Sequence, residues 1–258
     1  MARKKKKQTN WVWWITVPII IITLICIGYV WYTSFKVKES SFVRYPAFGI
    51  DMPVNFTIHG IDVSKHQGFI HWPSVKKMEV ENIKLGFVFI KATEGLLNVD
   101  KQFKTNWNNA GKAQLPRGAY HFFLATKSGK AQAKNFISTV TLHPGDLPPV
   151  LDIEQLYRVK PDKMRKEVQD WLDVVEAHYG VKPIIYTYVT FYTNYLQNDF
   201  DAYPLWVAHY LEKEKPRINR PWIIWQHNET GRVNGIKTRV DFNVFNGDSA
   251  EFYDLLIK

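Results

Sequence analysis

Cysteine is almost absent from this sequence of 258 residues, which has only Cys26. A single thiol excludes a disulfide within the chain and a cysteine-based zinc cluster. The sequence also lacks the Gly-x-Gly-x-x-Gly and phosphate-loop patterns of nucleotide-binding proteins and the Gly-x-Ser-x-Gly pattern of serine hydrolases. The folded part of the chain must therefore be held together by its own hydrophobic core.

Positive charge is in excess but unevenly distributed. The chain has 34 Lys and Arg against 24 Asp and Glu, and residues 1–57 hold eight of the former and two of the latter. A nucleic-acid-binding domain would carry a basic stripe on its folded surface, so we expect no nucleic-acid partner. Aromatic residues make up 15% of the chain, with 10 Trp and 13 Tyr. Such a surplus is typical of surfaces on which sugars or bases stack.

One long uncharged run lies near the N-terminus. Residues 11–32 contain no charged side chain, and a helix of that length would span about 33 Å, enough to cross a bilayer. Basic residues from Arg3 to Lys7 precede the run, and Trp and Tyr lie near its two ends, as at membrane interfaces. We therefore expect a transmembrane signal anchor over 11–32, a basic cytoplasmic tail over 1–10, and a periplasmic or extracellular remainder.

A cleaved signal peptide is the alternative for this run. The apolar segment is longer than such a peptide requires, and no small-x-small cleavage site follows it. Residues 33–57 contain Ser, Pro and Gly with little periodicity, so we expect a linker there. The folded domain is then expected over residues 58–258.

From residue 58 onward, short apolar strands alternate with amphipathic helices. Eight strands are expected, over 58–63, 85–92, 117–123, 149–153, 183–187, 205–209, 223–226 and 239–242. Six helices are expected, over 72–78, 102–113, 130–140, 162–179, 191–196 and 251–257. Apolar strands that alternate with helices imply a mostly parallel sheet. About eight strands in about 200 residues favour an α/β fold of the TIM-like barrel type.

In an α/β barrel, functional residues gather at the C-terminal ends of the strands. Four carboxylates are expected at that mouth, namely Asp62, Asp152, Glu154 and Asp241. Other polar side chains at strand ends are Lys91, Glu94, Tyr120 and Tyr186. A single aspartate at such a position is more often a helix cap or a turn residue. Several acids delivered to one face are harder to explain in that way.

Asp152 and Glu154 are the strongest candidates for catalytic residues. They leave an apolar strand at positions i and i+2, so both point to the same side, with backbones about 6.6 Å apart. Two carboxylates that close repel each other, and one tends to keep its proton at neutral pH. The resulting acid and anion give the division of labour that glycoside hydrolysis requires. A metal pair or a salt-bridged structural acid is the alternative.

Histidines offer the other route to a metal site. Six of them could in principle join Asp62 or Asp152, namely His59, His66, His71, His121, His209 and His227. None shows the His-Glu-x-x-His spacing of zinc enzymes, and most lie beside aromatic residues, where a packed or surface histidine is commoner. We expect no metal ion.

Eight short motifs occur in a recognisable order along the domain. They are Gly60–Ser64 with Gln67, Phe89–Gly95, Gly118–Phe122, Leu151–Glu154, Pro183–Thr187, Leu205–Ala208, Trp225–Gln226 and Val240–Asn243. Together they resemble glycoside hydrolase family 25, the Chalaropsis-type lysozymes of fungi, bacteria and phages. One such motif would be a weak signal, but eight in order are strong, and they cover nearly the whole expected domain.

The resemblance implies a flattened, irregular β/α barrel that cleaves the β-1,4 bond between N-acetylmuramic acid and N-acetylglucosamine in peptidoglycan, with no cofactor. Glu154 matches the proposed general acid of the family. Asp152 matches its partner, which would stabilise an oxocarbenium or oxazolinium ion. Asp62 and Asp241 match two further acids of the active-site mouth. Substrate assistance, a covalent intermediate and inversion stay open as mechanisms.

Glycan strands of peptidoglycan are therefore the expected partner. The candidate substrate-binding residues are Tyr120, Tyr186, Trp206, Trp225, Lys91 and Glu94. For any one of the aromatic residues, a place in the core is the alternative. Two other functions remain to be weighed, a non-catalytic wall-binding scaffold and a metal-dependent wall amidase or deacetylase. A chitinase-like specificity is a third.

Overall fold

The computed structural model describes residues 22–27, 41–210 and 212–258. The chain divides into two compact units, 1–40 and 41–258. In the first unit, residues 22–27 are helical. Within the described part of the chain, no helix is long and apolar enough to span a membrane. Apart from that short helix, the expected anchor and the expected cytoplasmic tail lie outside the described residues.

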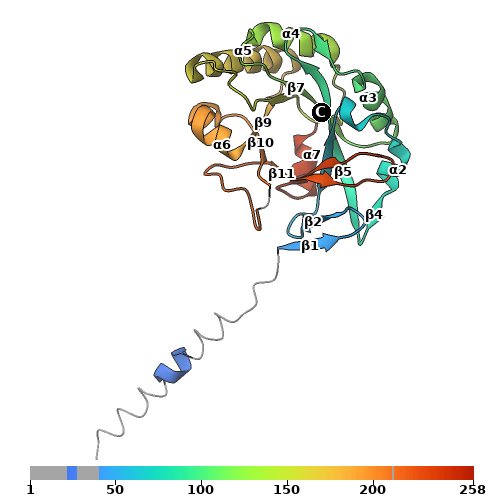
Figure 1. The fold of residues 1–258 in the computed structure, drawn as a ribbon, viewed down its shortest axis with the longest axis vertical. Coiled ribbons are helices and arrows are strands. Elements are labelled where there is room, and N and C mark those ends of the chain that lie inside the picture. The colour runs from blue at the N-terminus through green and yellow to red at the C-terminus, as the bar shows by residue number, and fades with distance from the viewer. Residues whose placement is uncertain (1–21, 28–40, 211) are drawn as a thin grey trace, which may run out of the picture. The chain divides into compact units, whose positions relative to one another are not determined.

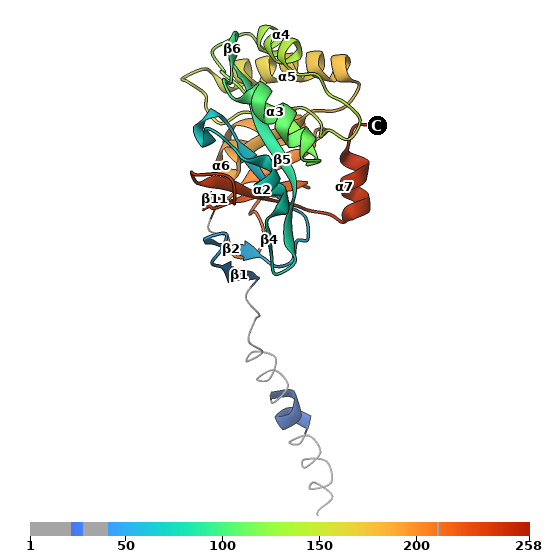
Figure 2. The ribbon, with the colours of Figure 1, turned by 90° about the vertical axis from the view of Figure 1, so that its right-hand side faces the viewer.

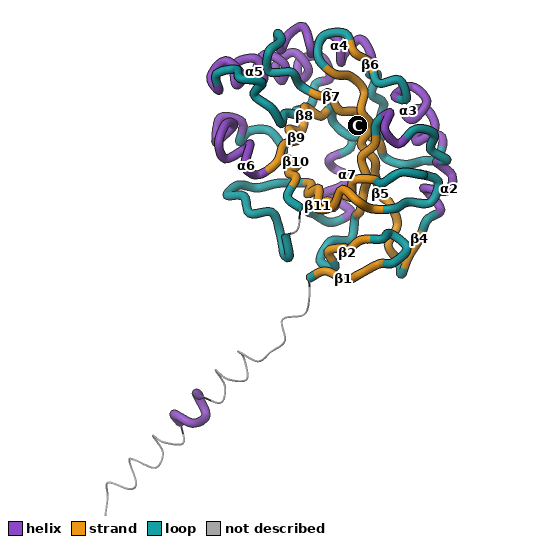
Figure 3. Tube along the Cα trace, in the orientation of Figure 1, coloured by secondary structure: helices purple, strands orange, loops and turns teal. Residues whose placement is uncertain are grey.

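The second unit is an α/β barrel of eight strands (Figures 1 and 3). Around the ring these are β3 (His59–Val63), β5 (Ile83–Glu94), β7 (Arg117–Phe122), β8 (Val150–Asp152), β9 (Ile184–Tyr188), β10 (Leu205–Ala208), β11 (Ile224–Gly231) and β12 (Val240–Phe245). Strand β3 pairs with both β12 and β5, so the ring is closed. The expected irregular TIM-like barrel is thereby confirmed, and each expected strand overlaps one of these eight.

Helices surround the ring on its outer side, as Figure 3 shows. They are α2 (Trp72–Lys77), α3 (Phe103–Lys112), α4 (Gly129–Thr139), α5 (Pro161–Tyr179) and α6 (Val189–Phe191), the last continued by the π-helix Tyr192–Leu196 and the 3₁₀ helix Gln197–Phe200. A further helix, α7 (Ser249–Leu255), lies at one end of the barrel (Figure 2). Minor elements are the 3₁₀ turn Lys65–Gln67 and the short strands β4 (Glu79–Val80) and β6 (Asn98–Val99), which pair with β5.

Helix α5 follows the rules that predicted it. Pro161 occupies the first helical turn, where its missing N–H costs nothing. Gly180 ends the helix with a φ of +71°, a left-handed conformation that glycine adopts without strain. Met164, Val168 and Trp171, which lie on one face of the helix, are fully buried against the barrel.

One strand departs from the parallel arrangement. Six neighbouring pairs of the ring are parallel, but β12 runs antiparallel to both β11 and β3. An antiparallel pair needs only a hairpin connection, whereas each parallel pair needs a crossover that brings a helix to the outer face. The outer face of β11 and β12 therefore requires another cover.

That cover comes from residues 41–57, which were expected to be part of a linker. They contain a hairpin of β1 (Phe42–Tyr45) and β2 (Ile50–Pro53), whose inner side chains Tyr45, Phe48, Ile50 and Met52 are buried. Phe48 packs against Phe242 of β12, with ring centroids 5.4 Å apart. The expected boundary at residue 58 is thus displaced, because these apolar side chains complete the core of the domain.

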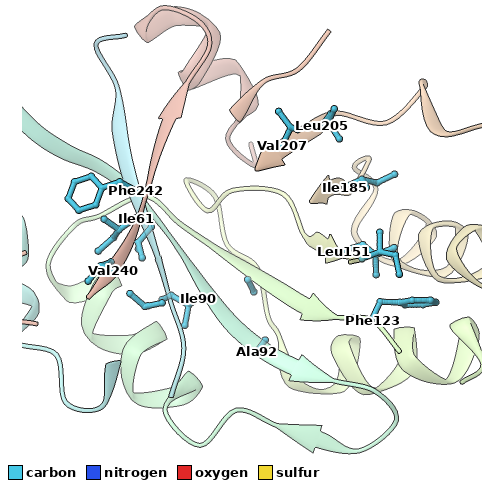
Figure 4. Packing of buried hydrophobic residues seen from close by; sticks show 14 of the residues in the cluster. Ile61, Ile90, Ala92, Phe123, Leu151, Ile185, Leu205, Val207, Val240 and Phe242 are labelled. Atoms are coloured by element: carbon cyan, nitrogen blue, oxygen red, sulfur yellow. The ribbon is translucent and has the colours of Figure 1, made fainter. Parts of the chain in front are cut away.

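Alternation along the strands divides the core into two layers. Outward-pointing side chains such as Ile61, Leu151 and Val207 belong to the larger cluster, which includes helix residues (Figure 4). Inward-pointing side chains such as Phe87 and Phe89 form a second cluster that ends on Phe252, Leu255 and Leu256 of α7. The next inward position on β5 is Lys91, so the interior changes from apolar to polar away from α7.

Candidate active site

A cleft of about 350 Å³ opens at the polar end of the barrel. It is lined by eight of the ten residues that the sequence suggested, namely Asp62, Lys91, Tyr120, Asp152, Glu154, Tyr186, Trp206 and Asp241. Each parallel strand contributes residues from its C-terminal part, as expected for this architecture. Glu94 and Trp225 are the two expected residues that do not line the cleft.

Asp241 reaches the cleft from the start of its strand. The sequence predicted an acid at a C-terminal strand end, but Asp241 is the second residue of β12. Because β12 runs antiparallel, its first residues lie level with the last residues of the parallel strands. Asp241 is accordingly paired in register with Asp62, near the end of β3.

Asp62 is held by two side-chain amides. Gln226 Nε2 and Asn243 Nδ2 each donate to Asp62 Oδ2 at 2.8 Å. Both amides are buried, and each is oriented by a further donor. Trp206 Nε1 donates to Asn243 Oδ1 at 2.8 Å, while the Tyr186 hydroxyl donates to Gln226 Oε1 at 2.8 Å. With their oxygens engaged in this way, both amides turn their N–H groups toward Asp62.

The Asp62 and Asp241 carboxyls are linked by a hydrogen bond. Burial, together with the nearby charge of Asp62, raises the pKa of Asp241 to about 9. Burial also raises the pKa of Asp62, but hydrogen bonds from Asn243, Gln226 and Asp241 oppose that rise. Asp241 is therefore the member that keeps a proton, and Asp62 is the more acidic partner.

Asp152 and Glu154 also have raised pKa values. Burial is the main cause for both. The charge of Glu154 adds to the rise at Asp152, whereas at Glu154 the charge of Asp62 adds and a hydrogen bond with Tyr186 opposes. The repulsion between the two carboxylates that the sequence suggested is present, but burial is the larger cause of the raised pKa values. Among the described residues, Asp152 Oδ1 has no hydrogen-bond partner.

The fold agrees with what is found among known proteins. The profile described as "Glycosyl hydrolases family 25" matches residues 61–236. The chain belongs to glycosyl hydrolase family 25. The match begins after the β1–β2 hairpin, so the hairpin lies outside the family profile.

Relatives of this family 25 chain include both a protein of unknown activity and a lysozyme. The uncharacterized protein YegX of Escherichia coli (strain K12) is 45% identical over 205 residues, covering 80% of this chain and 75% of that protein. Lysozyme M1 of Streptomyces globisporus is 36% identical over 213 residues, covering 77% and 71%.

Solved structures give the same assignment. A family 25 glycosyl hydrolase from Bacillus anthracis has a TM-score of 0.74 at 33% identity, covering 83% of this chain and 100% of that one. A bacterial lysozyme from Streptomyces coelicolor has a TM-score of 0.69 at 36% identity, covering 77% and 96%.

Trp225 is a core residue of the family 25 domain and not a sugar platform. It is 0% exposed. Because it precedes the inward-pointing Gln226, its side chain faces outward, where it packs against Phe42 and Phe56. Its indole N–H donates to the carbonyl oxygen of His209 at 2.9 Å. Trp206 lies on the inner face instead, stacked on Phe89 with ring centroids 4.5 Å apart.

Glu94 holds Lys91 beside the site, and its own charge also helps to raise the pKa of Asp152. Lys91 Nζ donates to Glu94 Oε2 at 2.7 Å and lies 4.5 Å from the centre of the Phe122 ring. Lys91 lines the cleft and lowers the pKa of both Asp152 and Glu154 through its positive charge. Glu94 thus fixes the position of a cation beside the acids.

Several polar residues of the site were not among the ten expected residues, including Gln226, Asn243, Tyr210 and Glu229. Gln226 and Asn243 were visible as parts of family motifs, but sequence gives no indication that they converge on Asp62. Tyr210 donates to Gln226 Oε1 at 2.6 Å, beside the hydroxyl of Tyr186. Their contribution depends on barrel closure, which brings β3, β11 and β12 together.

The histidines are mostly structural. His121 is buried and hydrogen-bonded to Thr93 at 2.7 Å, and burial lowers its pKa to about 3. His59 and His227 are buried beneath the hairpin side of the barrel, whereas His66 lines the cleft. Over residues 22–27, 41–210 and 212–258, no three His, Cys, Asp or Glu residues are arranged to hold a metal ion.

Proposed function

We propose that this family 25 domain hydrolyses the β-1,4 bond between N-acetylmuramic acid and N-acetylglucosamine in the glycan strands of peptidoglycan. The observation that carries the proposal is the pair Asp152 and Glu154, which leave one strand end and share a cleft with two further acids. Relatives named lysozyme and N,O-diacetylmuramidase support the choice of substrate. The reaction needs an acid and a second carboxyl group flanking the bond.

Glu154 is the proposed general acid. Its raised pKa lets the carboxyl keep its proton nearer to neutral pH, and the proton passes to the glycosidic oxygen as the bond breaks. A neighbouring carboxylate at Asp62 also favours the protonated form before the reaction.

Asp152 is the proposed partner. Its carboxyl lines the cleft, and its Oδ1 atom is buried with no hydrogen-bond partner among the described residues. It would accept the N–H of the substrate's N-acetyl group in an assisted reaction, or face the positively charged ring directly. Substrate assistance and a covalent intermediate both retain the anomeric configuration, whereas inversion reverses it, so the anomer first released separates inversion from the other two.

Membrane anchoring is the second part of the proposal. It rests on the uncharged run over residues 11–32 and the basic residues before it. Such an anchor would leave the catalytic domain on the periplasmic or extracellular side, where peptidoglycan lies. Cell fractionation of the full chain and of a variant lacking residues 1–40 tests it, since only the full chain should remain with the membrane after alkaline washing.

The proposed hydrolysis is tested with the full chain in detergent, its Glu154→Gln variant, and a Glu79→Gln control. Glu79 is an exposed acid, paired with Lys84 far from the cleft lining. Each protein is incubated with purified peptidoglycan, and the released fragments are reduced with borohydride and identified by mass spectrometry. We expect reduced muramic acid ends from the parent and the control, and at least about a 100-fold loss in Glu154→Gln.

Other outcomes select the competing functions. Reduced glucosamine ends would keep a hydrolase but reverse the bond assignment. Binding to the wall without release of fragments would favour a scaffold. Release of peptides without new reducing ends, abolished by a chelator, would favour a metal-dependent amidase.

A further inference from the structure

A second hollow of about 340 Å³ adjoins the cleft. The two share Glu154, Tyr186 and Tyr210. The second hollow then continues over the end of β9 and the end of β10, where it is lined by Tyr188, Val189, Thr190, Ala208 and His209. Glu154 therefore lies on the border between two adjoining spaces.

The position of Glu154 between the two spaces indicates which way round the substrate binds. Asp62, Asp152 and Asp241 line the first cleft and not the second hollow. Positive charge develops on the sugar ring whose bond is broken, so that ring is best placed beside these acids. A general acid protonates the oxygen between the two sugars. With Glu154 as that acid, the departing sugar lies beyond it, in the second hollow.

Tyr188 offers this sugar an aromatic face. Tyr186 and Tyr188 are two residues apart on β9, so both follow the inward-facing side of the strand. Tyr186 is buried, whereas Tyr188 is 39% exposed. The Tyr188 ring packs edge-on against the buried Phe191, with centroids 5.8 Å apart. It is thus supported from one side and accessible from another.

The remaining walls suit an uncharged sugar. The lining of the second hollow contains no lysine or arginine, whereas the first cleft contains Lys91. The exposed Thr190 provides a hydroxyl group. His209 is held in place because its Nδ1 accepts from the backbone N–H of Arg217 at 3.1 Å. Of the two peptidoglycan sugars, N-acetylmuramic acid carries a carboxylate, and N-acetylglucosamine does not.

We propose that the second hollow binds the leaving sugar, an uncharged N-acetylhexosamine, and that Tyr188 is the platform on which this sugar stacks. The inference rests on the proposed function, since it takes Glu154 as the general acid. It adds the direction in which the glycan strand crosses the site. The reducing-end side of the bound glycan lies over the ends of β9 and β10. Its non-reducing side lies beside Asp62, Asp152 and Asp241.

Two substrates with the same non-reducing sugars test this direction. One is the tetrasaccharide of alternating N-acetylglucosamine and N-acetylmuramic acid, which places a sugar in the leaving position. The other is the β-fluoride of the N-acetylglucosaminyl-N-acetylmuramic acid disaccharide, which places only fluoride there. The full chain is compared with Tyr188→Ala, Tyr188→Trp and the control Tyr157→Ala. Tyr157 is 40% exposed, and the charges of Asp152 and Glu154 contribute to its raised pKa. It lines neither the cleft nor the second hollow.

We expect Tyr188→Ala to lower kcat/KM for the tetrasaccharide at least about fivefold, and for the fluoride by less than about twofold. Tyr188→Trp, which keeps an aromatic face, should retain most tetrasaccharide activity, and so should Tyr157→Ala. Equal losses on both substrates, or no loss on either, would overturn the inference. If the unmodified chain hydrolyses neither substrate, the proposed function itself fails, and the inference fails with it.

Discussion

At the residue scale, the orientation of one buried amide controls Asp62. The Asn243 side chain donates to Asp62 because its oxygen is already occupied by the Trp206 indole N–H. We predict that Trp206→Phe, which keeps a ring against Phe89 but removes this donor, frees the amide to rotate. Asp62 then loses a hydrogen bond that lowers its pKa, so the acidic limb of the kcat/KM profile should move to higher pH. Activity at its optimum should fall roughly 10-fold.

Trp225→Phe is the matched control for this prediction. Trp225 is equally buried and its indole N–H is also engaged, but its partner is the backbone of His209 on the outer face of the barrel. The control should leave the pH profile in place. A Trp206→Phe enzyme whose acidic limb coincides with that of the parent would show that Asn243 needs no orienting partner.

The contrast between these two tryptophans marks the limit of sequence reasoning at this scale. Both follow apolar residues on barrel strands, and both faces of such strands are buried. Composition therefore could not tell which indole faces the cleft, and Trp225 was assigned wrongly. The acids were easier to place, because Asp62, Asp152 and Glu154 lie at or just beyond the ends of apolar strands, and several acids at one mouth are hard to explain as caps or turn residues.

At the scale of elements, the β1–β2 hairpin takes the place that a helix occupies elsewhere around the barrel. Phe48 is 0% exposed and packs against Phe242 of β12. We predict that Phe48→Ala lowers the free energy of unfolding by about 3–5 kcal/mol, because it leaves a cavity over β12 that the short hairpin cannot close. Urea unfolding followed by tryptophan fluorescence measures this. The control is Val43→Ala, at an exposed position of the same hairpin, which should change the free energy by less than about 0.5 kcal/mol.

A small effect of Phe48→Ala would mean that residues 41–57 are a tether after all. The sequence suggested a linker because residues 33–57 contain Ser, Pro and Gly with little periodicity. Gly49 has a φ of +71°, so it closes the turn and does not loosen it. The need for the hairpin arises only from the antiparallel β12, which leaves one outer face without a helix. That departure from the parallel pattern has no local signature.

At the scale of the whole molecule, two sets of buried groups oppose each other in their response to pH. Burial lowers the pKa of His59 to about 4 and that of His227 to about 3, against an ordinary value of 6.5. As the pH falls below 6.5, these two histidines bind protons in the unfolded chain but not in the folded chain. The free energy of unfolding must therefore decrease from about pH 6.5 toward these lower values.

The carboxyls of the cleft act in the other direction. The pKa of Asp241 is about 9 in the folded protein against an ordinary value of 3.8. As the pH rises above 3.8, the unfolded chain releases a proton that the folded chain keeps, so the free energy of unfolding decreases until about pH 9. Asp152 and Glu154 contribute in the same sense, since burial raises both pKa values. The site thus reduces stability in the neutral range.

We predict that single substitutions reveal the two opposing contributions to the stability profile. In His227→Phe, the slope below pH 6.5 should become shallower by up to about 1.4 kcal/mol per pH unit, the value for one proton, with the alkaline limb unchanged. In Asp241→Asn, the loss of stability between pH 6.5 and 9 should become shallower, and the loss toward acid between pH 6.5 and 4, which Asp241 opposes in the parent, should become steeper. Urea unfolding at half-unit steps from pH 3.5 to 9 measures both slopes, with the steps chosen to sample each limb. The slope depends on the difference in bound protons between the unfolded and folded chains, and not on any steric cost of the new side chain. An acidic limb that is unchanged in His227→Phe would therefore mean that His227 is protonated within the folded domain.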